Sequence, residues 1–157
     1  MKITTSPQSG SVHLLLRIPK YGDPIERVAE LHNAVATRHR TVWLGIVGKT
    51  YSAQNLEDIR QRGQYLYVVQ HQRNGLALMK ARIKGVDSAL PEADRHLAPE
   101  YYVSAQIIER AKIWVRITTL RVTPIEELDT LRVKSSGKKA TCTLNGLAYV
   151  AIVENEH

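Results

Sequence analysis

The segment Thr41–Val47, with the sequence TVWLGIV, constrains the fold more strongly than any other part of the chain. Side chains alternate between the two faces of a β-strand, so its aliphatic residues at every second position are predicted to face the core. Trp43 and Gly45 then lie on the opposite face, which leaves two interpretations. Trp43 either packs beneath a second layer of structure or forms the wall of a binding pocket.

The loop after this strand supplies the other groups that such a pocket needs. Gly45 and Gly48 leave the backbone bare beside Trp43, and Lys49 and Tyr51 follow directly. An aromatic wall, accessible backbone groups and a cation together suit a flat, polar ligand.

The rest of the chain reads as strands with short helices between them, without a regular βαβ repeat. Strands are predicted over 12–18, 65–71, 76–86, 112–122 and 146–153, with a bulge near Thr118-Thr119. The Arg73-Asn74-Gly75 turn predicts a hairpin. We therefore expect an α+β fold, namely a strongly curved mixed sheet or open β-barrel with short peripheral helices. Residues 1–157 are expected to form one domain, with 1–10 as a loose lead-in.

Three segments carry helix-start signals. Asp23-Pro24-Ile25-Glu26 and Thr123-Pro124-Ile125-Glu126 have the capping-box pattern, and Ser52 is predicted to cap a helix that ends at Gly63. In the first helix the buried stripe is predicted to comprise Ile25, Val28, Leu31 and Val35, with Ala29 or Ala36 as alternatives. His32 lies on or beside that stripe, where packing is a simpler explanation than ligand binding.

The charge balance favours a polyanionic partner. The net charge is +7 and the isoelectric point is near 9.7, which is typical of nucleic-acid-binding domains. Lys80, Arg82 and Lys84 form a comb on one face of a predicted strand; they either track phosphates or blunt an exposed edge. Trp114, next to Arg116 on a predicted non-core face, either stacks on a base or is covered by that arginine.

A second basic segment, Lys134–Lys139, has the sequence KSSGKK and contains no acid. Backbone N–H groups, hydroxyls and cations together suit a phosphate, although a plain solvated loop has the same composition. The segment is not a P-loop, because it lacks the required glycine spacing and a hydroxyl residue after the lysine.

Motifs for catalysis and for metal binding are missing. The chain has one cysteine, Cys142, so it has no internal disulfide, and a reducing cytoplasm is expected. No apolar run approaches the roughly 20 residues of a membrane span. Asp87, Asp94 and Glu100 on one predicted loop are the candidates for an acidic metal site, but no metal-ligand motif supports such a site. We expect no enzyme activity, no metal and no cofactor.

Several phrases of the chain resemble a known family when they are taken in order: VWLGIVGKTYS, LEDIRQ, YLYVVQHQRNGLALMKARI, APEYY, KIWVRITTLRVTPIEEL and RVKSSGKK. Over roughly Thr41 to Val153 the chain resembles the EVE-like branch of the PUA superfamily. That branch includes the N-terminal modules of McrBC-type modification-dependent restriction systems.

The resemblance implies a curved, barrel-like sheet that binds nucleic acid and, as in the similar YTH domains, holds a methylated base in an aromatic cage. The expected function is to read a modified DNA base by flipping it out, with an effector nuclease or NTPase subunit or domain as partner; RNA binding in RNA modification or metabolism is the alternative. The pocket is then expected to comprise Trp43, Gly45, Gly48, Lys49, Tyr51, Tyr101, Tyr102 and Trp114. The phosphate contacts are expected from Lys80, Arg82, Lys84, Arg116, Ser135, Ser136, Lys138 and Lys139.

Overall fold

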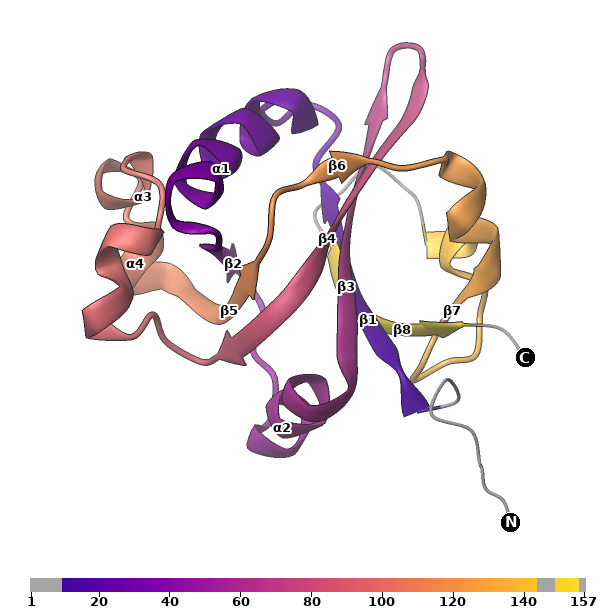
Figure 1. Ribbon diagram of the computed structural model, residues 1–157. Coiled ribbons are helices and arrows are strands. Elements are labelled where there is room, and N and C mark those ends of the chain that lie inside the picture. The colour runs from indigo at the N-terminus through magenta and orange to yellow at the C-terminus, as the bar shows by residue number, and fades with distance from the viewer. Residues whose placement is uncertain (1–9, 144–148, 156–157) are drawn as a thin grey trace.

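The computed structural model describes residues 10–143 and 149–155. They form an α+β fold with one large mixed sheet of eight strands, in the order β2-β5-β4-β3-β1-β8-β7, while β6 pairs with β4 (Figure 1). The described strands do not close into a barrel. Their bounds are Val12–Ile18 (β1), Val42–Val47 (β2), Gly63–Gln72 (β3), Gly75–Asp87 (β4), Ala111–Ile117 (β5), Arg121–Val122 (β6), Leu131–Val133 (β7) and Tyr149–Asn155 (β8).

The helices are short and lie around the sheet. The α-helices are Ile25–His39 (α1), Ala53–Arg62 (α2), Tyr101–Ser104 (α3) and Ile107–Arg110 (α4). Three 3₁₀ helices cover Glu92–Leu97 (η2), Ile125–Thr130 (η3) and Ala140–Thr143 (η4). The α+β class and the short helices are therefore as predicted. The loop expected over 87–100 contains η2, and most of the predicted lead-in lies outside the described residues.

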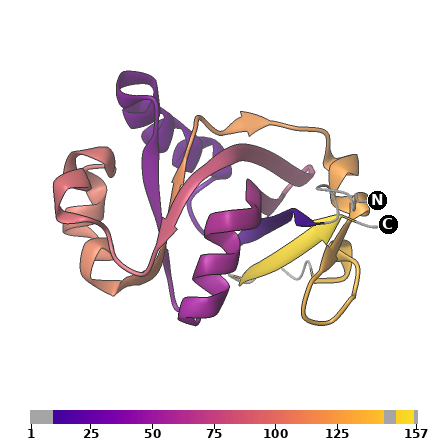
Figure 2. The same cartoon turned by 60° about the horizontal axis from the view of Figure 1, so that its bottom comes forward.

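The long strand β4 connects the two parts of the sheet. Its first part pairs with β3 and its second part with β5, and the register shifts between Ile83 and Gly85. The predicted hairpin at Arg73-Asn74 joins β3 to β4. The predicted irregularity near Thr118 separates β5 from β6, and the Thr118 hydroxyl accepts a hydrogen bond from the Arg82 backbone N–H there. Figure 2 shows how β4 curves past α2.

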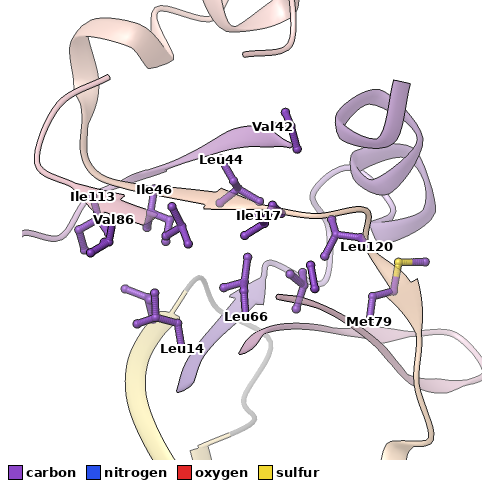
Figure 3. Packing of buried hydrophobic residues seen from close by; sticks show 14 of the residues in the cluster. Leu14, Val42, Leu44, Ile46, Leu66, Met79, Val86, Ile113, Ile117 and Leu120 are labelled. Carbon is purple, nitrogen blue, oxygen red and sulfur yellow. The ribbon is translucent and has the colours of Figure 1, made fainter. Parts of the chain in front are cut away.

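The main core lies between the two parts of the sheet. It contains the predicted core residues of β2, Val42, Leu44 and Ile46, together with Leu14, Leu66, Ile113 and Ile117 (Figure 3). Helices α1 and α2 complete this core. The buried residues of α1 are Ile25, Ala29, His32 and Ala36. Ile25 and the alternatives Ala29 and Ala36 are thus buried as predicted, whereas Val28, Leu31 and Val35 are only partly buried.

The helix starts differ from the predictions at two of the three sites. Ser52 caps α2 as predicted, since its Oγ accepts from the Asn55 N–H at 3.1 Å. The two capping boxes do not form: Pro24 and Pro124 occupy the cap positions without a side-chain bond. At α1, the Ile25 N–H instead donates to Gln70 Oε1 of β3 at 2.8 Å, so a distant strand satisfies the group that a local cap would have satisfied.

Two further layers cover the outer faces of the sheet. Helices η3 and η4 pack over β1, β3 and β8, burying among others Leu15, Val69 and Leu128. On the other part of the sheet, η2, α3 and α4 cover the outer face of β2 and β5. Both faces of β2 are therefore buried, which explains why apolar residues occur at nearly every position along it.

Candidate nucleic-acid interface

The tryptophans predicted to line an open pocket form a closed aromatic cluster, which we define as Trp43, Tyr101, Tyr102 and Trp114. Trp114 is 0 %, Tyr102 2 % and Trp43 5 % exposed. The Tyr102 ring contacts the Trp114 ring edge-on, with centroids 5.8 Å apart, and Tyr101 contacts Tyr102 at 4.9 Å. An open cage built from these rings is therefore a wrong prediction in this structure, and the alternative of packing beneath a second layer is right.

Gly45 has a packing role in this cluster. A Cβ atom at Gly45 would lie 2.9 Å from Trp114 Cη2 and 3.0 Å from the Ala111 Cβ. The missing side chain is thus filled by the indole of Trp114 and leaves no space for a ligand. The indole N–H groups are also used, because Trp43 Nε1 donates to Asp94 Oδ2 at 2.9 Å and Trp114 Nε1 to the Ala111 carbonyl at 3.1 Å.

A buried polar chain ties the cluster to α1. His32 Nδ1 lies 2.8 Å from the Val28 carbonyl and therefore donates to it, which leaves Nε2 to accept from the Tyr102 hydroxyl at 2.5 Å. The Tyr102 oxygen in turn accepts from the Gly45 N–H at 3.2 Å. Burial lowers the pKa of His32 to about 4 and raises the pKa of Tyr102 well above its usual range. Both groups are neutral and structural near neutral pH.

Lys49 and Tyr51, the other half of the predicted pocket, lie at a separate cavity of about 520 Å³, which we call the groove. It opens between the β2–α2 loop, the start of α2, the end of β7 and the strand β8. Its polar and aromatic lining residues are Lys49, Thr50, Tyr51, Ser52, Asn55, Lys134, Ser135 and Tyr149. The sequence patterns indicated Lys49, Tyr51 and Ser135 but not that they meet, and they missed Tyr149 altogether.

Two smaller cavities extend the groove at its ends. One, of about 260 Å³, shares Lys49 and Tyr149 with it and includes Gly48. The other, of about 300 Å³, shares Asn55 and Lys134 with it. The cavity at Asn55 and Lys134 is also lined by the acids Glu57 and Asp58.

The groove is positively polarised. Lys49 Nζ donates to the Val150 carbonyl at 3.3 Å and lies 5.4 Å from the Tyr51 ring centroid. Helix α2 begins at the groove and has no acid in its first turn, so its free N–H groups and dipole add to the positive potential. This combination favours an anion.

Lys134 has a nearby acid, but that acid is held mainly by another residue. Lys134 Nζ lies 3.6 Å from Asp58 Oδ2, whereas Arg62 binds both oxygens of Asp58 at 2.6 and 2.9 Å. The hydrogen bonds from Arg62 lower the pKa of Asp58. Lys134 can therefore turn towards a bound phosphate without leaving an unpaired carboxylate.

The predicted phosphate loop is a tight turn at the edge of the groove. The Gly137 N–H donates to the Val133 carbonyl at 2.8 Å, and Gly137 has a φ of 72°, which glycine adopts readily. Ser135 lines the groove, and Ser136 Oγ accepts from the Lys138 N–H at 3.3 Å. Lys138 and Lys139 are exposed. The structure thus brings Lys134 and Ser135 to the groove with Lys49 and leaves the loop residues 136–139 outside its lining.

The comb on β4 lies elsewhere and is only partly free. Lys80 Nζ binds Glu127 at 2.9 Å and lies 4.6 Å from the Tyr65 ring centroid, whereas Arg82 and Lys84 are exposed. Arg116 lies 6.0 Å from the Trp43 ring centroid. The arginine therefore covers Trp43 and not Trp114, the partner we expected.

Of the acids that were candidates for a metal site, two bind neighbouring protein groups. Asp94 binds Trp43, and Asp87 accepts from the Ser88 N–H. In the described part of the chain, no group of three or more histidine, cysteine, aspartate or glutamate side chains is arranged to hold a metal ion. The side chain of Cys142 lies outside the described residues. Among the described helices, none has the length and apolar character needed to cross a membrane.

Comparisons with protein-family models, curated proteins and solved structures gave no match to this chain.

Proposed function

We propose that the chain is a non-catalytic nucleic-acid-binding module with a curved, PUA-like sheet, and that an unpaired nucleotide binds in the groove. The observation that carries the proposal is the composition of the groove. Two ammonium groups, several hydroxyls and a helix N-terminus lie in one cavity beside two tyrosine rings. A phosphate requires the first set of groups, and a base requires the second.

The size of the groove favours one nucleotide over a duplex. Cavities of about 300–1,000 Å³ hold single small molecules, and the groove has about 520 Å³. The nucleotide is then either flipped out of a duplex or part of a single strand. The flanking cavity at Gly48 and Lys49 has no acid among its described lining residues and suits the neighbouring sugar–phosphate backbone, whereas Glu57 and Asp58 in the other cavity would repel it.

Within the groove, the phosphate is proposed to lie between Lys49 and Lys134, near the N-terminus of α2. The base is proposed to lie against Tyr149 or Tyr51. The buried guanidinium of Arg17 lies 4.6 Å from the Tyr149 ring centroid and holds this ring in position. A ring that is fixed before binding loses little conformational entropy when a base stacks on it.

Recognition of a modified base remains part of the proposal, but its site is the groove and not the aromatic cluster. Tyr51 and Tyr149 take the role that the sequence patterns assigned to Trp43 and Trp114. A methyl group on the base would add apolar contact with these rings. A tenfold preference for the methylated over the plain base, or about 1.4 kcal/mol, would reveal this contact.

The test is fluorescence anisotropy on matched plain and methylated duplexes, single-stranded DNA and single-stranded RNA, each at two salt concentrations. Preference for one modified duplex would support base reading, and preference for single strands would restrict the function to unpaired nucleic acid. Preference for RNA over DNA of equal sequence would select the RNA alternative. No binding to any of them would refute the proposal.

A charge-removing pair of variants tests the position of the site. Lys49→Gln with Lys134→Gln should weaken binding and reduce the slope of log affinity against log salt by about 0.7, the value for one single-strand phosphate contact. The matched control, Lys20→Gln with Arg38→Gln, removes the same charge from exposed positions of a turn and of α1. Equal slopes for the two double variants would show that the groove is not the binding site.

A further inference from the structure

A second basic surface, separate from the groove, lies on the outer face of β4 and its neighbours. We define this basic stripe as Lys80, Arg82, Lys84, Arg116 and Arg121. Lys80 and Arg121 are direct partners in the β4–β6 ladder, so their side chains share a face. Figure 1 shows β4 running between α3 and α4 on one side and η3 on the other.

Most cations of the stripe have no acid to neutralise them. Among the described residues, neither Arg82, Lys84, Arg116 nor Arg121 has a carboxylate within 4.0 Å, whereas Lys80 is paired with Glu127. Arg82, Lys84 and Arg121 are exposed. Arg116 donates from Nη2 to the Lys84 carbonyl at 3.4 Å, and its Nε is buried without a partner in the described structure. Like charges held close together without counter-charges destabilise a fold unless a polyanion uses them.

The geometry of the stripe fits a backbone and not bases. Alternate residues of a strand are spaced by about 6.7 Å, which is comparable with the spacing of successive phosphates along an extended nucleic-acid strand. The aromatic ring at the stripe, Tyr65, is covered by the Lys80 ammonium group at 4.6 Å. The stripe thus offers mainly charged side chains, whereas two tyrosines line the groove.

We infer that the basic stripe is a second, sequence-independent contact surface for the sugar–phosphate backbone of the nucleic acid whose unpaired nucleotide occupies the groove. This inference rests on the proposed function. It adds that the contact area for nucleic acid extends beyond the groove, and that the two surfaces have different roles. The groove selects the nucleotide, and the basic stripe slows dissociation by binding the backbone of any flanking segment.

The experiment compares two ligands on the full chain. One is a short single strand of about five nucleotides, near the lower end of single-strand site sizes; the other is the same strand extended by a duplex. Arg82→Ser with Lys84→Ser should reduce the salt slope for the extended ligand by about 1.8, which is about 0.9 for each lost duplex phosphate contact. It should leave the affinity for the short strand unchanged. Lys20→Ser with Arg38→Ser is the control of equal charge.

The outcomes separate the two proposals. If the wild-type protein binds neither ligand, the proposed function is wrong. If it binds both, and the stripe variant and the control have the same slope on the extended ligand, the second surface does not exist. A stripe variant that weakens both ligands equally would also overturn the inference, because it would place Arg82 and Lys84 at the groove or show a general loss of structure. Far-ultraviolet circular dichroism distinguishes that loss.

Discussion

Replacing Gly45 with alanine should destabilise the protein, although alanine is normally better tolerated in a strand. The new Cβ would lie 2.9–3.0 Å from Trp114 and Ala111, closer than such atoms approach in folded proteins. Trp114 is fully buried and cannot move aside freely. Overpacking of this kind costs about 1–3 kcal/mol, and removal of the glycine returns about 0.5–1 kcal/mol. The net loss should therefore be about 0.5–2 kcal/mol.

Gly85 provides a matched control on β4. A Cβ there would meet the Arg116 and Trp43 side chains at 3.7–3.9 Å, which is ordinary contact, so Gly85→Ala should be neutral or stabilising by up to about 1 kcal/mol. Urea unfolding monitored by tryptophan fluorescence measures both variants, and the difference should be about 0.5–3 kcal/mol with unchanged m values. A Gly45→Ala midpoint at or above that of Gly85→Ala would show that Trp114 does not fill the space beside Gly45.

Two further predictions concern the layer around the aromatic cluster. Burial lowers the pKa of His32 to about 4, so below pH 6.5 the unfolded chain binds a proton that the folded chain excludes. As the pH falls from about 6 to 4.5, the free energy of unfolding should therefore fall by about 1.4 kcal/mol per pH unit. Urea titrations should show that His32→Gln flattens this dependence while His39→Gln, at an exposed position, keeps it; equal slopes would contradict the assignment. Trp43→Phe removes the donor to Asp94 and should cost about 1.5 kcal/mol in the same assay. A cost within experimental error would mean that this bond does not hold η2 on β2.

The parts of the fold that depend on short-range patterns were predictable from the sequence. Alternation along β2 placed Val42, Leu44 and Ile46 in the main core, and the hairpin at Arg73-Asn74 follows from the turn chemistry. The cap at Ser52 also depends on residues three positions apart. In each case the determining contacts lie within a few residues of one another.

The second layers could not be predicted in this way. Trp43 and Trp114 were assigned to an outer face correctly, but whether that face is open depends on α3. That helix is held by the bond from Tyr102 to His32, across 70 positions of sequence. The first capping box was mispredicted for the same reason: the Ile25 N–H donates to Gln70 of β3, a residue far away in the sequence. An apolar pattern on both faces of β2 was the signal that could have favoured packing.

The candidate site was predicted in pieces. Local composition assigned Lys49 and Tyr51 to the base pocket and Ser135 to a separate phosphate site. Their meeting depends on the registers of β7 and β8, which bring the loop after β7 to the start of α2. Tyr149 carried no local signal, because its role depends on Arg17 of the facing strand.

The pairing of β1 with β8 has a consequence for how the chain is made. The side chains of His13 and Asn155 are hydrogen-bonded across 142 positions of sequence, so one edge of β1 stays unpaired until β8 has been synthesised. During synthesis this open edge exposes unpaired N–H and C=O groups that can template aggregation. A prematurely terminated chain that lacks β8 would keep that edge and lose Tyr149 from the groove. Closure of this edge and completion of the proposed groove therefore both depend on β8.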